Sequence, residues 1–449
     1  MRETPVSISR RRRDDSAERK EFTFTKEMMR LSGVSEYLQE YRRNAWEVYQ
    51  NLAFPTTSME AWRRTDIHQL AINELLLSQM GGSHKISRVP RDLLRPLAPN
   101  SKEGQVILEP GVSRINMDQD LIKKGVVFTD LQTAEGQYPE ILEKIMGKIV
   151  HSDEGKFAAL ASALSQYGVL LYVPRGVSIE QPLHSILWGP GTKLAFLSHI
   201  LVYLEEGATV TYVHEASSPN EAGGQSLHAG LVEIVVGPGA NLRLVELQSW
   251  GHHVWNFCHE RVRLDHDANL EWIFGSIGSH LTKDFAEIEL AGAGSTGKMS
   301  GFFFTDQGQH LDHDTQQTHL APNTTSDLLF KGALKGKSRS VWQGMIYVAP
   351  EAVKTDGYQA NRNLILSNKA RADSIPGLEI LADDVRCSHG ATVGKVDPEM
   401  IFYLISRGIP RPEAEKMIVE GFFDPIIQRI PFDGVRNRFL KAIQKKMDA

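Results

Sequence analysis

The fold of this 449-residue chain is decided by four short triplets, Ala208-Thr209-Val210, Ala240-Asn241-Leu242, Ala268-Asn269-Leu270 and Gly297-Lys298-Met299. Each triplet has a small, a polar and an apolar residue, and successive triplets start 32, 28 and 29 residues apart. Further units start near Ser338 and at Ala370, again 32 residues apart. A repeat of this length in a strand-rich chain indicates a solenoid, a propeller or an array.

A β-helix type solenoid, in which each turn stacks its strands on the previous turn, fits this spacing best. Propeller blades need about forty residues or more per repeat, and a pair of β-sandwiches is the remaining alternative. The strand pattern starts at Gly168, where apolar and polar residues begin to alternate between Gly, Asn and Asp. Residues 172–177 are predicted to be a strand followed by a turn. We therefore expect a mainly β solenoid core over residues 166–395.

The region before the core has mostly helical spacing. We predict an α-rich domain over residues 21–165, preceded by a disordered tail over residues 1–20, where Arg10–Arg13 are followed by acidic residues. The expected elements are helices over 26–52, 139–150 and 155–166, a helix start at Ser58 that turns Trp62 inward, and strands over 106–109 and 125–128.

The region after the core, residues 396–449, is predicted to be a helical domain. Asp397-Pro398-Glu399 is a helix start with Asp as N-cap, and Gly408 is placed to end that helix. A second helix starts at Arg411 and closes at Gly421, and a third follows. Such helices can cap the exposed end of a solenoid. Two residues just past the second helix, Phe422 and Phe423, are either core or part of a surface that docks another protein.

The composition disfavours several classes of protein. Lys and Arg total 50 against 55 Asp and Glu, a net charge of −5, whereas a nucleic-acid binder is usually basic. Two cysteines cannot form a disulfide framework, which suits a reducing cytosol. The sequence lacks an apolar run of membrane-spanning length and the apolar core of a signal peptide. We therefore expect a cytoplasmic protein without a membrane segment.

The candidate metal ligands are Cys387 and His389, in the stretch from Asp383 to Gly394. Strand alternation would place both side chains on one face. Thiolate and imidazole are ligands that iron, zinc and copper accept. Two groups make half a metal site, so the other ligands would come from elsewhere in the fold or from a partner chain. The alternative is a buried Cys beside a hydrogen-bonded core His.

Two other stretches are rich in possible ligands. Within Gln309–His319, alternation places His310, Asp312 and Asp314 on one face and His313 on the other, which favours a polar strand surface over a metal site. The second stretch matches no zinc-binding spacing, and its members are His252, His253, Cys258 and His259.

Known catalytic motifs are absent from the sequence. It contains no Walker P-loop, Rossmann fingerprint, nucleophile elbow or HExxH, so we expect no nucleotide bound through a P-loop of its own. Asp383 and Asp384 would point to opposite faces of a strand, which disfavours the paired carboxylates of a polysaccharide-cleaving enzyme.

The most specific stretch of the sequence runs from Lys354 to Gly394. Its segments are Thr355-Asp356-Gly357-Tyr358-Gln359-Ala360-Asn361-Arg362-Asn363, Pro376-Gly377-Leu378-Glu379-Ile380 and Cys387-Ser388-His389-Gly390-Ala391-Thr392. Together with residues 172–177, 319–323 and 406–409, they closely resemble the SufB/SufD family of iron–sulfur cluster assembly proteins of the SUF system. The resemblance covers almost everything after residue 50.

Two positions separate the branches of this family. SufB-type proteins are expected to carry a Gln-Cys-Asp-Ser segment, whose Cys handles sulfur, and later a Glu-His-Glu-Ala-Thr segment. Here an ungapped match places Asn361 at that Cys and Gly390 at the second Glu, while His389 is kept. An amide cannot carry a persulfide, so the chain resembles the SufD-type branch.

The resemblance implies a right-handed parallel β-helix flanked by N-terminal α-rich and C-terminal α-helical domains. It also implies a non-enzymatic scaffold subunit that pairs with a SufB-type paralogue and docks a SufC-type ABC ATPase. His389 would lie at the paralogue interface and hold iron or a transient Fe–S cluster shared with the partner, with Cys387 as a second candidate. The docking candidates at the C-terminal helices are Arg407, Gly408, Phe422 and Phe423.

Two other functions remain open from the sequence. One is a stand-alone iron-binding homodimer, since the same strand edge can pair with itself. The other is a β-helix enzyme acting on polysaccharide, for which a secretion signal and a cleft with carboxylates would be needed.

Overall fold

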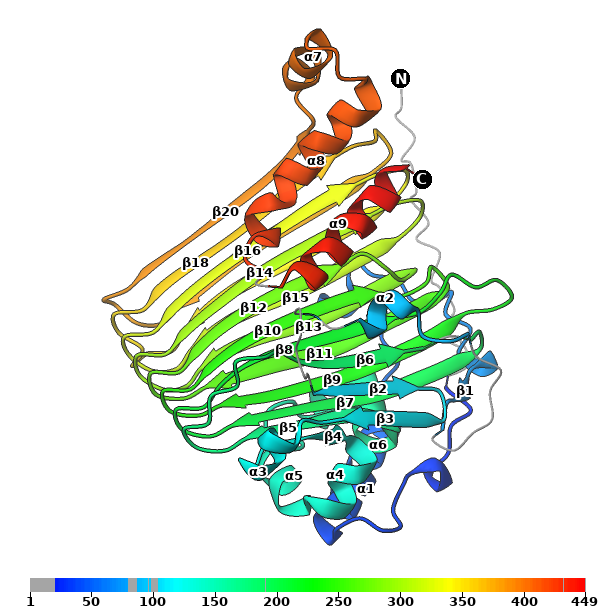
Figure 1. Ribbon diagram of the computed structural model, residues 1–449, viewed down its shortest axis with the longest axis vertical. Coiled ribbons are helices and arrows are strands. Elements are labelled where there is room, and N and C mark those ends of the chain that lie inside the picture. Colours follow the sequence, from blue (N-terminus) through cyan, green and yellow to red (C-terminus); the bar gives the residue numbers. More distant parts are fainter. Residues whose placement is uncertain are drawn as a thin grey trace, which may run out of the picture.

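The computed structural model describes residues 21–79, 87–95, 97, 104–189, 191–430 and 432–448. The predicted tail over residues 1–20 lies outside this part of the chain. Two ten-stranded sheets face each other and form a β-solenoid, with almost every pair of neighbouring strands parallel (Figure 1). From β5 to β20, consecutive strands alternate between the two sheets, so the chain winds from one sheet to the other. The solenoid prediction is therefore confirmed.

The first sheet has the odd-numbered strands from β5 to β19 together with β4, in the order β19-β17-β15-β13-β11-β9-β7-β5-β4, with β1 beside β7. Its strands are β1 Leu76–Leu77, β4 Val127–Asp130, β5 Tyr167–Val173, β7 Leu194–Leu204, β9 Ser226–Val236, β11 Val254–Leu264, β13 Leu281–Leu290, β15 His310–His319, β17 Arg339–Val348 and β19 Arg371–Ile380.

The second sheet has the order β20-β18-β16-β14-β12-β10-β8-β6-β2-β3. Its strands are β2 Gln105–Glu109, β3 Val112–Asn116, β6 Leu183–Trp188, β8 Thr209–Ser217, β10 Asn241–Ser249, β12 Asn269–Ser276, β14 Thr296–Thr305, β16 Thr325–Leu334, β18 Asp356–Ile365 and β20 Arg386–Lys395.

The triplets that predicted the repeat lie in one row of the second sheet, with one correction. Thr209, Asn241 and Asn269 are paired in register. Asn269 then pairs with Thr296, so the fourth triplet was placed two residues too late along the chain. A shift of two residues keeps each side chain on its face of the sheet, and for this reason the error did not change the predicted fold.

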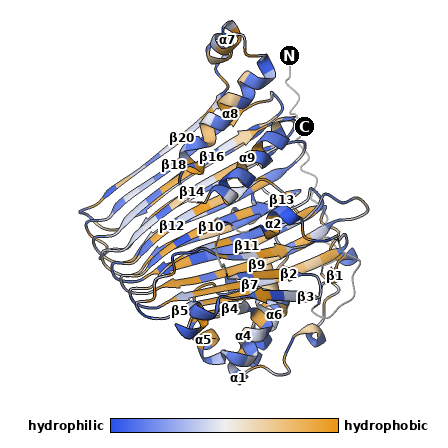
Figure 2. Cartoon of the chain, viewed as in Figure 1, coloured by the Kyte–Doolittle hydropathy of each residue, from blue (hydrophilic) through white to orange (hydrophobic). Residues whose placement is uncertain are grey.

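Apolar side chains fill the space between the two sheets. They include Val202, Leu204, Val210, Leu242 and Trp272, all of which are at most 2% exposed. The hydropathy of the strands changes along the solenoid: β7 and β9 are largely hydrophobic, whereas β18 and β20 are mostly hydrophilic (Figure 2). The solenoid therefore becomes more polar toward its C-terminal end.

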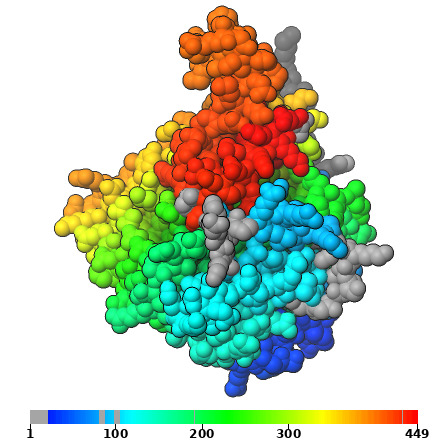
Figure 3. All heavy atoms as spheres, in the orientation of Figure 1, coloured from blue at the N-terminus to red at the C-terminus, as the bar shows by residue number. Residues whose placement is uncertain are grey.

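Three C-terminal helices follow β20: α7 Pro398–Ser406, α8 Arg411–Ile427 and α9 Asp433–Asp448. Helices α8 and α9 pack on the outer face of the second sheet through a shared apolar cluster. The second helix continues through Gly421 to Ile427, so the prediction that it closes at Gly421 is wrong. The packing of its last turns against the sheet outweighs the low helix propensity of glycine. Helix α7 projects away from the sheets (Figure 3).

The N-terminal helices cover the outer face of the first sheet. The main ones are α1 Glu36–Asn51 and α6 Lys156–Leu164, and every residue of α6 is buried. The ring of Phe157 stacks on Phe257 of β11 with centroids 3.9 Å apart. The shorter elements are α2 Arg91–Leu94, α3 Gln119–Lys123, α4 Leu131–Gln137, α5 Pro139–Ile145, and 3-10 turns Lys26–Met28, Glu60–Trp62, Ile72–Glu74 and Ser152–Glu154.

The helix predicted over residues 26–52 is shorter than expected, because Ser35 caps α1 and residues 26–28 form only a 3-10 turn. Ser58 likewise does not cap a helix, although Trp62 does point inward and is 8% exposed. None of the described helices is long and apolar enough to span a bilayer.

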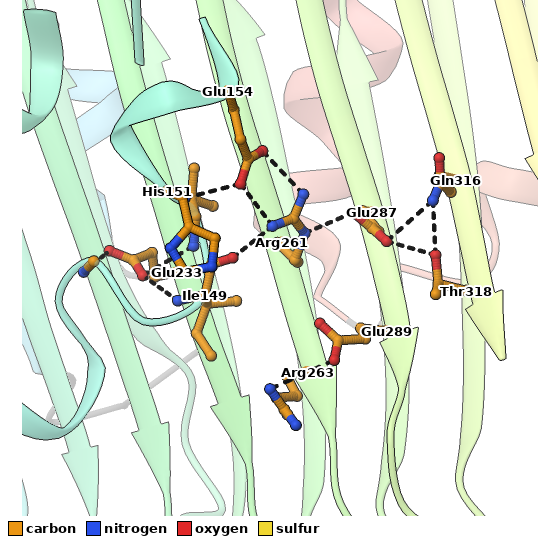
Figure 4. A network of polar contacts seen from close by, with 12 residues as sticks. Ile149, His151, Glu154, Glu233, Arg261, Arg263, Glu287, Glu289, Gln316 and Thr318 are labelled. Carbon is orange, nitrogen blue, oxygen red and sulfur yellow. Dashed lines mark hydrogen bonds and ion pairs between the residues drawn. The ribbon is translucent and has the colours of Figure 1, made fainter. Parts of the chain in front are cut away.

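A buried carboxylate fastens the N-terminal region to the sheet. Glu233 of β9 is fully buried and accepts hydrogen bonds from the backbone N–H groups of Gly147, Ile149 and Val150 (Figure 4). Its carboxylate also lies 2.7 Å from Nε2 of His199 on the neighbouring strand β7. Because several donors converge on one buried carboxylate, this contact fixes the position of the loop before α6.

Candidate functional site

The C-terminal end of the solenoid is open. Strand β20 pairs with β18, and β19 pairs with β17, and neither has a second neighbour in the described part of the chain. Each of these edge strands is ten residues long. Strand β19 contains Pro376, which has no N–H and is tolerated at an edge where its nitrogen faces away from the neighbouring strand. Unpaired backbone groups of this kind can pair with another chain.

The predicted ligands lie on β20 at this open end. His389 is exposed and pairs in register with Gln359, while Cys387 is half-buried and pairs with Gly357. A Cβ atom on Gly357 would lie 3.3 Å from Sγ of Cys387 and 3.5 Å from Nε2 of His319. The absent side chain therefore leaves room beside the sulfur.

Burial raises the pKa of the Cys387 thiol, and the nearby carboxylate of Asp356 raises it further. The sulfur packs against a small apolar cluster that includes Ile346 and Val348. A thiol in such surroundings is protonated near neutral pH and is a weak ligand until a cation lowers its pKa. The structure thus leaves His389 as the more accessible of the two groups.

Asn361, the residue at the sulfur-handling position of the SufB-type pattern, is fully buried on β18. Its Oδ1 accepts hydrogen bonds from Ser374 of β19 and from Nδ2 of Asn363. Beside it, Nε2 of Gln359 donates to the carbonyl groups of Gly344 and Gly377. These amides connect the two sheets at the open end, a role that the sequence analysis did not foresee, although inward-facing amides at alternate positions of one strand were a signal for it.

The described residues contain no group of three or more His, Cys, Asp or Glu side chains arranged to hold a metal ion. Cys387 and His389 therefore remain two groups on an open edge, without further ligands from the described part of this chain.

The ligand-rich stretch on β15 has a structural role. The amine of Lys283, fully buried, lies 3.0 Å from Asp312 and 2.8 Å from Asp314. Thr65 of the N-terminal region donates to Asp312, and its hydroxyl is 3.0 Å from Nε2 of His310. These contacts join the N-terminal region to β15, in agreement with the prediction of a polar strand surface.

In the second ligand-rich stretch, His252 and His253 precede β11, while Cys258 and His259 lie on its two faces. His259 stacks on Phe285 at the outer face, with ring centroids 4.6 Å apart. Cys258 points into the solenoid, where its sulfur lies 3.7 Å from Nδ1 of His228. Burial raises the pKa of the Cys258 thiol well above its usual value.

Buried carboxyl groups surround this thiol inside the solenoid. Glu246 accepts a hydrogen bond of 2.6 Å from Nε1 of Trp272, and burial raises its pKa to about 7. Burial also raises the pKa values of Glu260 and Asp284 well above the usual range. This cluster was not predictable from the sequence, because its members lie on three strands and become neighbours only through the register of the solenoid.

Helix α7 presents an unusual amount of apolar surface. None of its residues is buried. The guanidinium of Arg407 lies 4.5 Å from the ring centre of Tyr403, and Gly408 has a φ of +87° that ends the helix. The exposed apolar residues are Met400 at 56%, Phe402 at 72%, Tyr403 at 55% and Ile405 at 43%.

The two phenylalanines of α8 differ in position. Phe423 is fully buried, with its ring centroid 5.4 Å from that of Phe302, so its side chain belongs to the core. Phe422 is partly buried, and its ring lies 4.9 Å from the amine of Lys331. A cavity of about 650 Å³ separates α7 from the ends of β18 and β20.

The fold and the site define the class: a parallel β-solenoid scaffold whose open end presents an exposed imidazole, a half-buried thiol and unpaired strand edges. Comparison with known proteins narrows this class. Residues 188–422 match the family described as SUF system FeS cluster assembly, SufBD core domain, and residues 20–184 match the SufBD protein N-terminal region. The chain belongs to the SufB/SufD family of iron–sulfur cluster assembly proteins.

Individual relatives agree with this assignment. The chain is 35% identical over 331 residues to the iron–sulfur cluster assembly protein SufB of Bacillus subtilis, covering 73% of this chain and 70% of that protein. It is 32% identical over 328 residues to SufBD family proteins of Staphylococcus epidermidis and Staphylococcus haemolyticus, with the same coverage of 73% and 70%.

Proposed function

We propose that this chain is a SufD-type scaffold subunit of a cytosolic iron–sulfur cluster assembly complex, without catalytic activity of its own. In this proposal the core over residues 166–395 pairs through β19 and β20 with a SufB-type subunit. The helical region over residues 396–449 docks a SufC-type ABC ATPase. The nascent cluster is cargo that His389 helps to hold at the paralogue interface, with iron delivery as a further contribution.

The open end of the solenoid is the observation that supports this proposal most strongly. His389 is exposed on an edge strand, and the described residues do not complete a metal site around it. A second chain that paired with β20 would bring its own side chains next to His389. Edge pairing and completion of the site would then be one event.

The assignment to the SufD branch rests on Asn361 and Gly390. Asn361 accepts two side-chain hydrogen bonds in the interior, and its amide has no sulfur to transfer. Gly390 has no carboxylate that could join His389 as a ligand. Both positions favour a subunit that receives the cluster beside a partner's sulfur over one that carries sulfur itself.

Helix α7 supports the docking part of the proposal. Its residues Phe402 and Ile405 are exposed and also line the cavity beneath it, and Arg407 and Gly408 follow at the end of the helix. Phe422, partly buried beside Lys331, stays a docking candidate of α8, whereas Phe423 belongs to the core. An exposed helix face with Phe402 at its centre suits a protein partner.

Anaerobic co-expression with the SufB-type and SufC-type proteins of the same host tests the proposal. The wild-type chain and His389→Ala would be compared by light-scattering mass, bound iron and bound sulfide. We expect a mixed complex in both cases and a loss of at least about tenfold in cluster yield with His389→Ala, because a metal ligand is removed. Ser388→Ala, the adjacent exposed position, is the matched control.

The possible outcomes separate the alternatives. A mixed complex whose cluster yield is unchanged in His389→Ala would support the scaffold function and show that His389 does not hold the cluster. A chain that forms only dimers of itself and binds iron would replace the proposal with the stand-alone homodimer.

A further inference from the structure

A groove of about 580 Å³ lies on the outer face of the first sheet, between the N-terminal region and β19. Its apolar lining includes Phe285, Met345, Ile375 and Pro376, while Val150 and Glu154 come from the N-terminal region. A volume of this size is typical of ligand-binding sites in proteins. The groove includes neither Cys387 and His389 nor α7, although one of its sides is β19 of the open end.

Negative charge predominates in this groove. Its described lining includes one guanidinium, that of Arg261, and four carboxylates: Glu60, Glu154, Glu287 and Asp314. Glu260 also contributes to the lining, but burial raises the pKa of its carboxyl group well above the usual range.

Two cations near the groove are each shared between two carboxylates, while Glu60 pairs with Arg63 alone at 2.6 Å. Arg261 donates to both oxygens of Glu154 at 2.8 and 2.9 Å and to Glu287 at 2.6 Å (Figure 4). The buried amine of Lys283 is likewise shared between Asp312 and Asp314. Each cluster therefore keeps a surplus negative charge. A negatively charged rim above an apolar floor fits arginine side chains, whose planar cations sit on apolar stems.

The described chain begins close to this groove. Phe22 packs against Phe157 with ring centroids 6.3 Å apart, Phe157 lies 5.9 Å from Trp62, and Trp62 lies 6.2 Å from Phe285 in the groove. The sequence before Glu21 contains the run Arg10–Arg13. Eight extended residues span roughly 26 Å, a reach longer than the succession of ring contacts from Phe22 to Phe285.

We propose that residues 1–20 bind in this groove, with the guanidinium groups of Arg10–Arg13 on its carboxylates and their stems on Phe285 and Met345. A short tether gives an effective concentration in the millimolar range. This local concentration favours the chain's own segment over a basic segment of another protein.

Protection of a thiol placed in the groove tests this proposal in the full-length chain. In a Cys387→Ser background, Met345→Cys supplies the only accessible thiol among the described residues, because Cys258 is buried. We expect replacement of Arg10–Arg13 by Ser to accelerate labelling of Cys at position 345 at least about tenfold at low salt. The difference should shrink at about 1 M salt, where the Debye length is about 3 Å.

Two further variants make the result specific. Glu60→Lys, an exposed change at the rim, should also accelerate labelling at position 345 while the tail is intact. A thiol placed at the exposed position 269 on the second sheet, through Asn269→Cys, should label at one rate in all backgrounds. Equal labelling at position 345 with and without the four arginines would overturn the proposal. Protection that needs an added partner protein would also overturn it and would assign the groove to that partner.

Discussion

The two ends of the solenoid differ in their outermost strands and in the helices that cover them. At the N-terminal end the outermost strands, β3 and β4, are five and four residues long and run antiparallel to their neighbours. Helices α4 and α5 bury Leu131 and Ile145 against the end of the first sheet. At the C-terminal end, β19 and β20 are ten residues long and parallel to their neighbours. Apolar residues exposed there are Leu378, Ile380, Leu381 and Val393, at 37%, 37%, 52% and 50%.

The difference is consistent with the proposed association through the C-terminal end. Short antiparallel strands and covering helices are devices that prevent edge pairing, whereas a long uncovered edge favours it. A solenoid needs a cap at each end, and here the described helices leave the C-terminal edges uncovered. The following changes test this contrast, from the largest expected effect to the smallest.

Side-chain truncation should give the largest difference between the two ends, measured as a loss in the free energy of unfolding. Phe157→Ala empties a site that is 1% exposed beneath the N-terminal helices, and we expect a loss of about 3–5 kcal/mol in the free energy of unfolding. Leu378→Ala at the open end should cost less than about 1 kcal/mol. Denaturant titration monitored by circular dichroism measures both, and similar losses would contradict the contrast.

The pH dependence of stability should come from the interior and not from the open end. Burial raises the pKa of Glu246 to about 7 in the folded chain, against 4.5 for the ordinary group. The folded state therefore binds the extra proton between these values, and stability falls as the pH rises through this window. At pH 8, Glu246→Gln should be more stable than the wild type by on the order of 1–3 kcal/mol.

Denaturation midpoints at pH 5 and pH 8 would measure this effect. The glutamine amide that replaces the carboxyl group at position 246 can still accept the hydrogen bond from Trp272, so the variant removes the charge and keeps the contact. Parallel pH profiles for the two proteins would show that Glu246 does not titrate in this window.

A charge at the open end should weaken association without unfolding the chain. Val393→Lys places an amine at a position that is 50% exposed on β20, so the free energy of unfolding should change by no more than about 0.5 kcal/mol. Affinity for the paralogue should fall about tenfold, since lysine disfavours edge pairing. Asn269→Lys, on the exposed face of the same sheet, is the control, and equal affinities of the two variants would argue against pairing through β20.

The smallest effect concerns the thiol of Cys387. Burial is the main cause of its raised pKa, and Asp356 adds to it. Asp356→Asn should therefore lower this pKa slightly and raise the rate of alkylation at pH 8 by less than about threefold. Asp383→Asn is the matched control. Identical alkylation rates for the wild type and both variants would show that Asp356 does not affect the pKa of Cys387.

The sequence predicted the solenoid because its repeat has a local signature. The triplets around Thr209 and Asn241 recur in successive turns. The N-cap at Asp397 was also predicted correctly from the sequence. The end of α8 was predicted wrongly, because the contact of Phe423 with Phe302 stabilises the helix beyond Gly421. Local propensity is weak against such packing.

The candidate site was predictable only in part. Alternation predicted that Cys387 and His389 share one face of a strand, and their ligand chemistry and then the family resemblance singled them out. Their different exposure was not predictable, because it depends on Gly357 in the preceding turn and on the absence of a strand beyond β20 in the described chain. The interior cluster of Glu246, Glu260 and Asp284 required the register of three strands.

In the proposed complex, the proline in β19 affects the order in which the two paired chains separate. Pro376 offers no N–H, whereas β20 contains no proline, so a partner gains fewer backbone hydrogen bonds along β19 than along β20. The contact along β19 is then weaker than the contact along β20, and we expect the two chains to separate first at β19. His389 lies on β20, where the contact is stronger. A cluster held beside His389 would therefore be released last, after the interface has opened along β19.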